Sequence, residues 1–160
     1  MHDFGTITTK RSILFGAAIL LAFTAACGAS EGMEDEDMME RLGAAREEVH
    51  RHHTATSASP SLLALRSEGA IHDEKMSRIL GGLDHAMDGM RHCSRDGMEA
   101  MQGVLDGMHT AMHGHTEALE QATELESARR ACDGHTMAMS GMLTDFDGAV
   151  RGAHCSMMEP

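Results

Sequence analysis

The feature that most constrains the fold is an internal repeat with an offset of 63 residues. The order H-x-H followed by H-x-x-x-M occurs twice, first with its histidines at 50, 52 and 72, and again with them at 113, 115 and 135. Repetition at a fixed period is typical of a duplicated structural unit. Because each copy spans two segments with helical periodicity, we interpret it as a duplicated helical hairpin.

Four segments, 33–55, 60–92, 96–121 and 124–155, have apolar residues at alternating steps of three and four. This spacing is typical of helices that bury one face in a bundle. The chain has 16 Met, four Phe and no Tyr or Trp, which favours helices over strands. We therefore expect a signal peptide over 1–26, a tether over 27–32, and an all-α, antiparallel four-helix bundle over 33–156.

Local signals indicate where the second and fourth helices begin. Ser59 is expected to cap the second helix, with Pro60 at its first position, since proline is favoured there. Thr123 and Glu126 have the spacing of a capping box for the fourth helix. The segment "CSRDG" at 93–97 separates the two hairpins.

Short loops make neighbouring helices antiparallel, so residues equally far from a hairpin turn share a level. Counting from turns near 58 and 122 places His72 and His135 opposite each other on diagonal helices. The same count puts Ala45 and Met108 at their level. Met76 and Met139 are expected to stack one turn further along the bundle.

Neutral imidazole and thioether together form a soft ligand set that suits Cu(I). We expect one site built from His72, His135, Met76 and Met139, with Met108 and Cys132 as spare soft donors. A buried imidazole without a partner costs about 1–3 kcal/mol, and the seams offer few acceptors other than sulfur. The alternative is that these methionines only fill the core, as unbranched thioethers often do.

A second group of histidines lies in the last turns of the first and third helices. His50 and His52 belong to the first helix, and their repeat mates His113 and His115 belong to the third. Histidine is favoured near helix C-termini, which explains the group without a ligand. The alternative is a looser metal site near the bundle end for Cu(II), Zn or Ni.

The N-terminus has the organisation of an export signal. Lys10 and Arg11 precede the apolar run "SILFGAAILLAF" and the small-residue sequence "TAAC", which ends at Cys27. This resembles a bacterial lipoprotein signal peptide with Cys27 as the lipidated residue. The resemblance implies export to the periplasm or cell envelope, with a lipid anchor in the outer membrane.

The remaining cysteines, the net charge and the absence of catalytic motifs in the sequence limit the range of possible functions. Cys93 and Cys155 end the second and fourth helices, so a disulfide between them is plausible, whereas Cys132 is expected to remain a free core thiol. The formal net charge of −12 argues against nucleic acid as a partner. We expect no enzymatic activity, because the sequence contains no recognisable nucleophile and base set.

As a class, the mature domain resembles Met- and His-rich exported helical proteins that bind copper. The resemblance rests on the composition and on the two H-x-x-x-M pairs. It implies copper sequestration, delivery or resistance, with a protein that donates or accepts the metal. Two alternatives stay open: a bundle that holds haem non-covalently between histidines, and a lipoprotein with a purely structural role.

Overall fold

The computed structural model describes residues 33–90 and 93–153, and four helices run through them. They are α1 (Met33–Ala58), α2 (Leu62–Gly89), α3 (Arg95–Gln121) and α4 (Leu125–Gly152). No strand occurs within these two ranges. The expected all-α bundle is confirmed.

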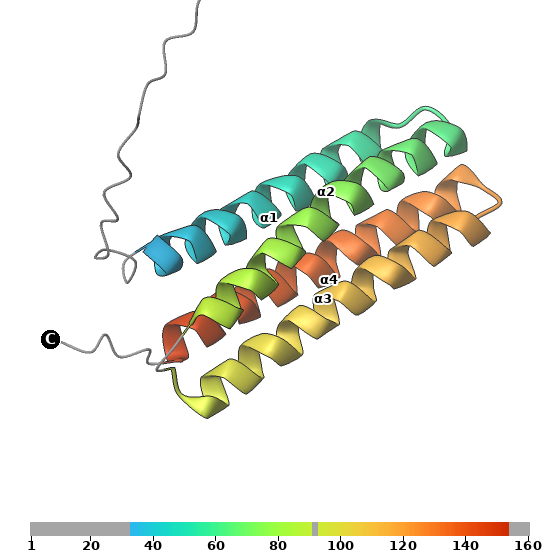
Figure 1. The fold of residues 1–160 in the computed structure, drawn as a ribbon. Helices are drawn as coiled ribbons and strands as arrows, with labels where there is room; N and C mark the ends of the chain where they lie inside the picture. Colours follow the sequence, from blue (N-terminus) through green and yellow to red (C-terminus); the bar gives the residue numbers. More distant parts are fainter. Residues whose placement is uncertain (1–32, 91–92, 154–160) are drawn as a thin grey trace, which may run out of the picture.

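Two antiparallel hairpins make up the bundle, and they lie side by side along their whole length (Figure 1). Each helix packs against its neighbours in sequence, and α1 packs against α4 to close the bundle. The diagonal helices α2 and α4 also come into contact across the core. This up-down-up-down arrangement is the one that short loops impose.

The expected helix starts need correction at two loops. Ser59 does not cap α2, because α1 continues to Ala58 and the Ser59 hydroxyl donates to the Ala55 carbonyl. Ser61 caps α2 instead, accepting the Ala64 N–H at 3.2 Å. At the second loop the N-cap is Glu124, one residue after Thr123, and its side chain makes no capping hydrogen bond.

The link between the hairpins is tied to the end of α4. The Ser94 side chain caps α3, and the Ser94 N–H donates to the Ala153 carbonyl at 2.9 Å. A Cβ at Gly97 would lie 2.5 Å from the Ala153 Cα, so only glycine permits this close approach. The hairpins separate slightly earlier than expected, because α2 ends at Gly89 and α3 already begins at Arg95, so that only the first two residues of 93–97 precede α3.

The apolar core consists of two clusters. The larger one fills the half of the bundle near the α2–α3 link and includes Leu42, Leu80, Leu105 and Phe146. The smaller one lies under the two hairpin loops and contains Leu65, Leu119, Ala122, Ala128 and Cys132. Along every helix, a buried histidine falls between the residues of the two clusters or at their edge.

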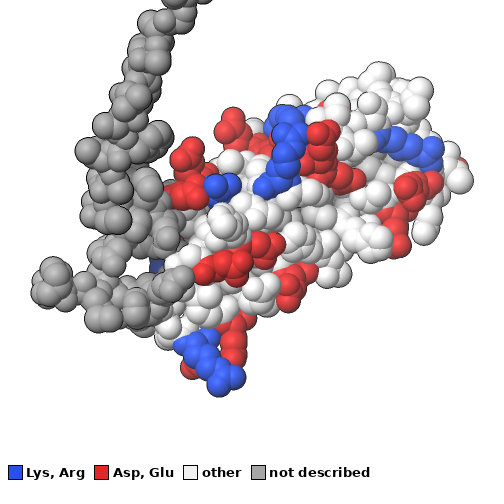
Figure 2. Space-filling model, in the orientation of Figure 1, with Lys and Arg blue, Asp and Glu red and all other residues white. Residues whose placement is uncertain are grey.

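Charges of both signs are interspersed over the visible face of the bundle, with broad uncharged areas between them (Figure 2). Among the described helices, none has the length and apolar character needed to cross a membrane. The expected signal peptide, Cys27 and the tether lie outside the described residues. Cys93 is disulfide-bonded, while its expected partner Cys155 also lies outside them.

Two leucines on α2 give a matched test of the core. Leu83 is fully buried, whereas Leu63 is 79% exposed. We expect Leu83→Ala to lower the free energy of unfolding by about 2–5 kcal/mol, because it leaves a cavity in a closed seam. Leu63→Ala should change it by no more than about 0.5 kcal/mol. Urea unfolding followed by circular dichroism measures both; equal losses would contradict this packing.

Candidate metal centre

One histidine from each helix is buried at a single level of the bundle. These four residues, called the histidine layer from here on, are His52 of α1, His72 of α2, His115 of α3 and His135 of α4. Their exposed fractions lie between 0% and 7%. Because histidine is rarely buried without a partner, four at one level require an explanation.

The four rings are packed directly against one another. His52 stacks on His72 with centroids 4.0 Å apart, and His115 stacks on His135 at 4.1 Å. The two stacks meet edge to face, with the centroids of His52 and His115 5.1 Å apart. His72 Nε2 and His135 Nε2 are separated by 3.1 Å, so these two rings do face each other across the diagonal.

The levels assigned from the sequence are wrong for the other two helices. His52 and His115, rather than Ala45 and Met108, lie beside His72 and His135. Helical side chains lean toward the N-terminus of their own helix, so partners in an antiparallel pair are offset from the level of their Cα atoms. The first turn also lies at 59–61 rather than at 58. Two histidines from each of the two expected metal sites therefore lie together in one cluster.

A carboxylate lies behind the Nδ1 atom of three of the four rings. Glu48 Oε1 is 3.1 Å from His72 Nδ1. Glu68 Oε1 is 3.8 Å from His52 Nδ1, and Asp73 Oδ1 is 3.7 Å from His115 Nδ1. The first separation is a hydrogen bond and the other two are looser contacts. The expectation that sulfur would be nearly the only acceptor is thus wrong.

Cations hold two of these carboxylates in place. Arg51 donates from Nε to Glu48 Oε2 at 2.7 Å, and its Nη1 lies 2.6 Å from Glu68 Oε1. Lys75 Nζ lies 3.6 Å from the same oxygen, Glu48 Oε2. Arg51 therefore joins the residues behind His72 and His52 into one network.

Two of these carboxylates, Glu48 and Asp73, remain ionised although they are partly buried. Burial raises the pKa of Glu48, but hydrogen bonds from Arg51 and His72 outweigh it and bring the pKa below its ordinary value. The pKa of Asp73 is likewise lowered despite burial, through His115 and Thr116. An ionised carboxylate only accepts, so the Nδ1 of His72 carries the proton and its Nε2 lone pair faces the core.

Most of the other ring nitrogens have no hydrogen-bond partner among the described residues. This holds for both nitrogens of His52 and both of His115. The His135 Nε2 is within reach of His72, to which it donates if His72 is protonated at Nδ1. Buried lone pairs that converge on one another without donors are an arrangement that a cation would satisfy.

Cys132 adds a sulfur donor at the same place. One donor atom each from His52, His115 and Cys132 lie within 4.8 Å of one another. Cys132 is a free, buried thiol, as expected, and it lies one helical turn before His135. Burial raises the pKa of its thiol to about 11, although a hydrogen bond with Thr56 partly opposes this.

The expected thioether donors lie further along the bundle. Met76 and Met139 are fully buried one turn beyond His72 and His135, in the larger apolar cluster. Met108 belongs to the same cluster, two turns from His115. The structure thus gives these methionines packing contacts in the larger cluster, and it brings imidazole and thiol donors together in the histidine layer.

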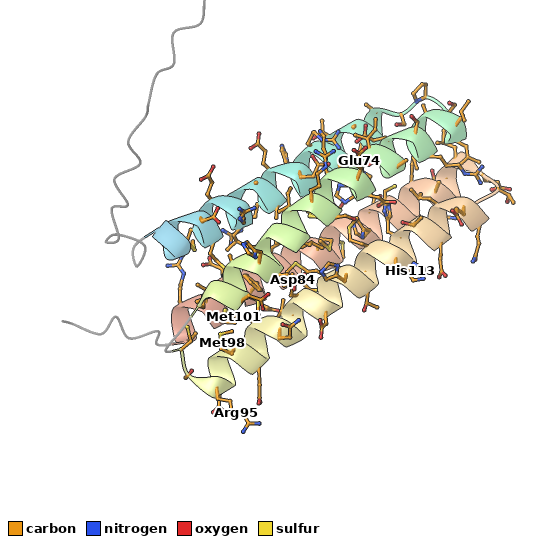
Figure 3. All side chains as sticks on the ribbon, viewed as in Figure 1. Glu74, Asp84, Arg95, Met98, Met101 and His113 are labelled. Atoms are coloured by element: carbon orange, nitrogen blue, oxygen red, sulfur yellow. The ribbon has the colours of Figure 1, made fainter. Side chains whose placement is uncertain are left out.

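Two of the expected histidines stay outside the cluster. His50 is exposed on α1. His113 points outward from α3 (Figure 3), where its side chain is 77% exposed and lies 3.3 Å from Glu117. Of each H-x-H pair, only the second histidine therefore enters the layer.

Three carboxylates of the site escape the sequence pattern because they flank the apolar seams. Glu48 precedes His52 by one helical turn, and Asp73 directly follows His72. Glu68 precedes His72 by one turn. An acidic residue next to a seam histidine, or one turn before it, is the signal that would have indicated them.

No family model, curated protein or solved structure matches this chain.

The metal-free bundle should lose stability as the pH falls from 6.5 to 5. Burial lowers the pKa of His52 to about 2 and that of His135 to about 3, from 6.5. The unfolded chain then binds more protons than the folded chain below pH 6.5. The free energy of unfolding should fall by about 1.4 kcal/mol per pH unit for each such histidine. Urea unfolding at several pH values measures the slope.

The matched control separates buried from exposed histidines. Replacing His52 and His135 together by Leu should reduce the slope by about two protons. His113→Leu, which removes an exposed ring, should leave it unchanged. The same slope in all three proteins would show that the buried rings are not held neutral.

Proposed function

We propose that the histidine layer and Cys132 bind copper as Cu(I), so that the protein sequesters or delivers this metal. The observation that carries the proposal is the convergence of buried imidazoles whose nitrogens lack partners among the described residues. Two of them share a space with the thiol of Cys132. Each unpartnered nitrogen costs about 1–3 kcal/mol, which a bound cation would recover.

The donor types favour a soft or borderline ion. Imidazole and thiolate are preferred by Cu(I) and Zn(II), whereas Mg(II) and Ca(II) prefer oxygen. Three donors close together, with Cys132 among them, suit the low coordination numbers of Cu(I). Binding would displace the thiol proton, because a thiolate is the ligand.

The carboxylates support a ligand role for the rings. A metal-bound histidine usually donates its other N–H to a carboxylate or carbonyl, which fixes the ring and its tautomer. His72, His52 and His115 each have such a group behind Nδ1. Their Nε2 atoms are thereby directed to the centre of the bundle, where a shared ion would lie.

The geometry is less suited to haem. Bis-histidine ligation needs a flat macrocycle between two rings, yet His72 Nε2 and His135 Nε2 are only 3.1 Å apart. The other two rings fill the remaining space at this level by stacking on them. Haem binding would require the layer to be taken apart.

The cellular setting of this proposal comes from the sequence alone. The N-terminal segment resembles a lipoprotein signal, which would place the bundle in the cell envelope, anchored to the outer membrane through Cys27. Cytosolic thiol buffers are absent there, and thiolates are prone to oxidation. A buried site rich in imidazole, with one shielded thiol, fits that setting, and a second protein would supply or receive the copper.

An anaerobic titration with Cu(I) against a chromophoric chelator tests the proposal on the protein starting after Cys27. We expect tight, stoichiometric binding. Replacing His52 and His115 by Leu and Cys132 by Ala should weaken it by at least about a hundredfold, since three donors are lost. The control replaces the exposed His50 and His113 by Leu and should bind like the wild type.

Each result of the titration has a definite meaning. Equal binding by the triple variant and the wild type would remove copper from the layer. No binding by either, together with a Soret band after haem reconstitution, would favour the haem protein. If Zn(II) binds tightly and Cu(I) does not, the proposed residues bind a metal ion, but that ion is Zn(II) rather than Cu(I). Failure of all three ligands would favour a structural role.

The carboxylates should also affect copper affinity without binding the metal. Asp73→Asn removes the charge behind His115 and should weaken binding by about 10–100-fold, as loss of such partners does in metal sites. Its sequence neighbour Glu74 is 72% exposed and pairs with Arg78. Glu74→Gln should leave the copper affinity unchanged in the same titration. If both substitutions weaken binding equally, Asp73 affects the affinity only through the net charge of the protein.

A further inference from the structure

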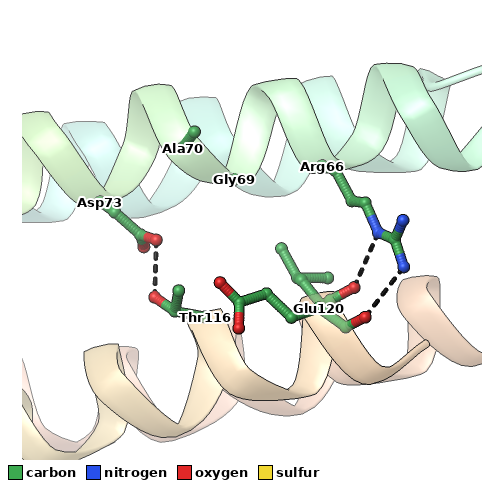
Figure 4. Close-up of a pocket in the computed structure, with 7 residues that line it drawn as sticks. Arg66, Gly69, Ala70, Asp73, Thr116 and Glu120 are labelled. Atoms are coloured by element: carbon green, nitrogen blue, oxygen red, sulfur yellow. Dashed lines mark hydrogen bonds between the residues drawn. The ribbon is translucent and has the colours of Figure 1, made fainter.

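A surface pocket of about 260 Å³ lies between α2 and α3 (Figure 4). Two of the residues that line it, Asp73 and Thr116, directly follow His72 and His115 of the histidine layer. Arg66, Gly69, Ala70 and Asp73 line it from α2, and Thr116, Leu119 and Glu120 from α3. The layer itself is buried, so an ion that binds there must pass through one of the grooves between the helices. This pocket is a candidate for that passage.

Gly69 keeps the wall between the pocket and His115 thin. A Cβ at this position would lie 2.4 Å from Leu119 Cδ1 and 4.0 Å from His115 Cε1. The His115 ring is therefore separated from the Gly69 backbone by little more than the tip of the Leu119 side chain. A change in the rotamer of Leu119 alone would open this wall without unfolding either helix.

Asp73 connects the pocket to the ring. Its Oδ2 accepts the Thr116 hydroxyl at 2.7 Å, as Figure 4 shows, which fixes the carboxylate against α3. Its Oδ1 lies 3.7 Å from His115 Nδ1 and has no hydrogen-bond partner in the described part of the chain. Neither nitrogen of His115 has one, and this side chain is more than nine-tenths buried.

The charges in the pocket favour a cation. Asp73 and Glu120 contribute two carboxylates. The guanidinium of Arg66 is held by backbone carbonyls, donating to Leu119 at 2.9 Å, to Glu120 at 3.0 Å and to Ala122 at 2.7 Å. Arg66, the one cationic residue that lines the pocket, thus donates to backbone carbonyls and leaves the two carboxylates unpaired with it.

The duplication supplies a second pocket for comparison, between α1 and α4. It measures about 220 Å³ and is lined by Thr56, Ser57, Arg129 and Asp133. Arg129 donates to the Ser59 carbonyl, as its repeat mate Arg66 does to Ala122. Cys132 stands where the first pocket has Gly69, and it is hydrogen-bonded to Thr56. Asp133 lies 3.7 Å from His53 and is the one acidic residue lining this pocket.

We infer that the α2–α3 pocket is the port through which the metal ion reaches the histidine layer, with Asp73 as the residue that captures it and passes it to His115. This inference rests on the proposed function, since it requires that the layer binds copper. It adds a direction to that function, because the α1–α4 side has Cys132 and Thr56, hydrogen-bonded to each other, at the positions where the α2–α3 side has Gly69 and Leu119. Loading is therefore one-sided, although the bundle is built from a repeat.

Anaerobic stopped-flow loading tests the port, with Cu(I) supplied as a chelate and the loss of chelate absorbance followed in excess protein. Ala70→Phe fills the α2–α3 pocket, and Ser57→Phe fills the other as the matched control. We expect Ala70→Phe to slow loading by at least about tenfold and Ser57→Phe to change it less than about twofold. The equilibrium stoichiometry, measured separately, should be the same in both.

A second pair of variants tests the electrostatics of the port. Glu120→Gln removes a charge from the pocket, while Glu117→Gln removes one from the same helix outside it. Loading should slow by about threefold or more in the first variant at low salt and remain near the wild-type rate in the second.

The outcomes separate the port from the proposed function. Equal loading rates for the two phenylalanine variants, with full copper binding in both, would overturn the port and leave the metal site standing. A slower rate for Ser57→Phe alone would assign access to the α1–α4 side and also overturn it. If the wild type takes up no copper at equilibrium, the proposed function fails and the port falls with it.

Discussion

The organisation of this bundle depends on four imidazoles that are buried at one level. Their rings divide the apolar core into two clusters, and they leave nitrogens without partners among the described residues. Burial disfavours the protonated form, so His52 and His135 are kept neutral well below their ordinary pKa. Neutral imidazoles with converging lone pairs are the form of histidine that binds metals.

The two copies of the repeat form similar helical hairpins, but the carboxylates near the histidine layer are distributed unequally between them. All three carboxylates behind the rings come from the first hairpin: Glu48 from α1, and Glu68 and Asp73 from α2. Their repeat mates are Ala111, Ala131 and Thr136. His135 is consequently the one ring of the layer without a carboxylate behind it. In the second hairpin, Cys132 occupies the position that corresponds to Gly69 and adds a sulfur atom. The first hairpin thus contributes carboxylates, and the second a thiol, to the surroundings of the same four rings.

The sequence predicts the fold well because the apolar seams, the short loops and the repeat all lead to the same bundle. It also predicts that His72 and His135 meet across the diagonal. It fails for His52 and His115, since a level counted on Cα atoms ignores the tilt of side chains toward the helix N-terminus. It misses Glu48, Glu68 and Asp73 because nothing in a seam pattern shows which flanking carboxylates turn inward.

X-ray absorption at the copper edge of the Cu(I)-loaded protein tests most directly which atoms bind the metal. A site in the histidine layer predicts imidazole nitrogens, with their characteristic multiple scattering, together with one sulfur that disappears in Cys132→Ala. A first shell made only of thioether sulfur would instead place the metal among Met76, Met108 and Met139. That result would contradict the assignment of the layer as the metal centre.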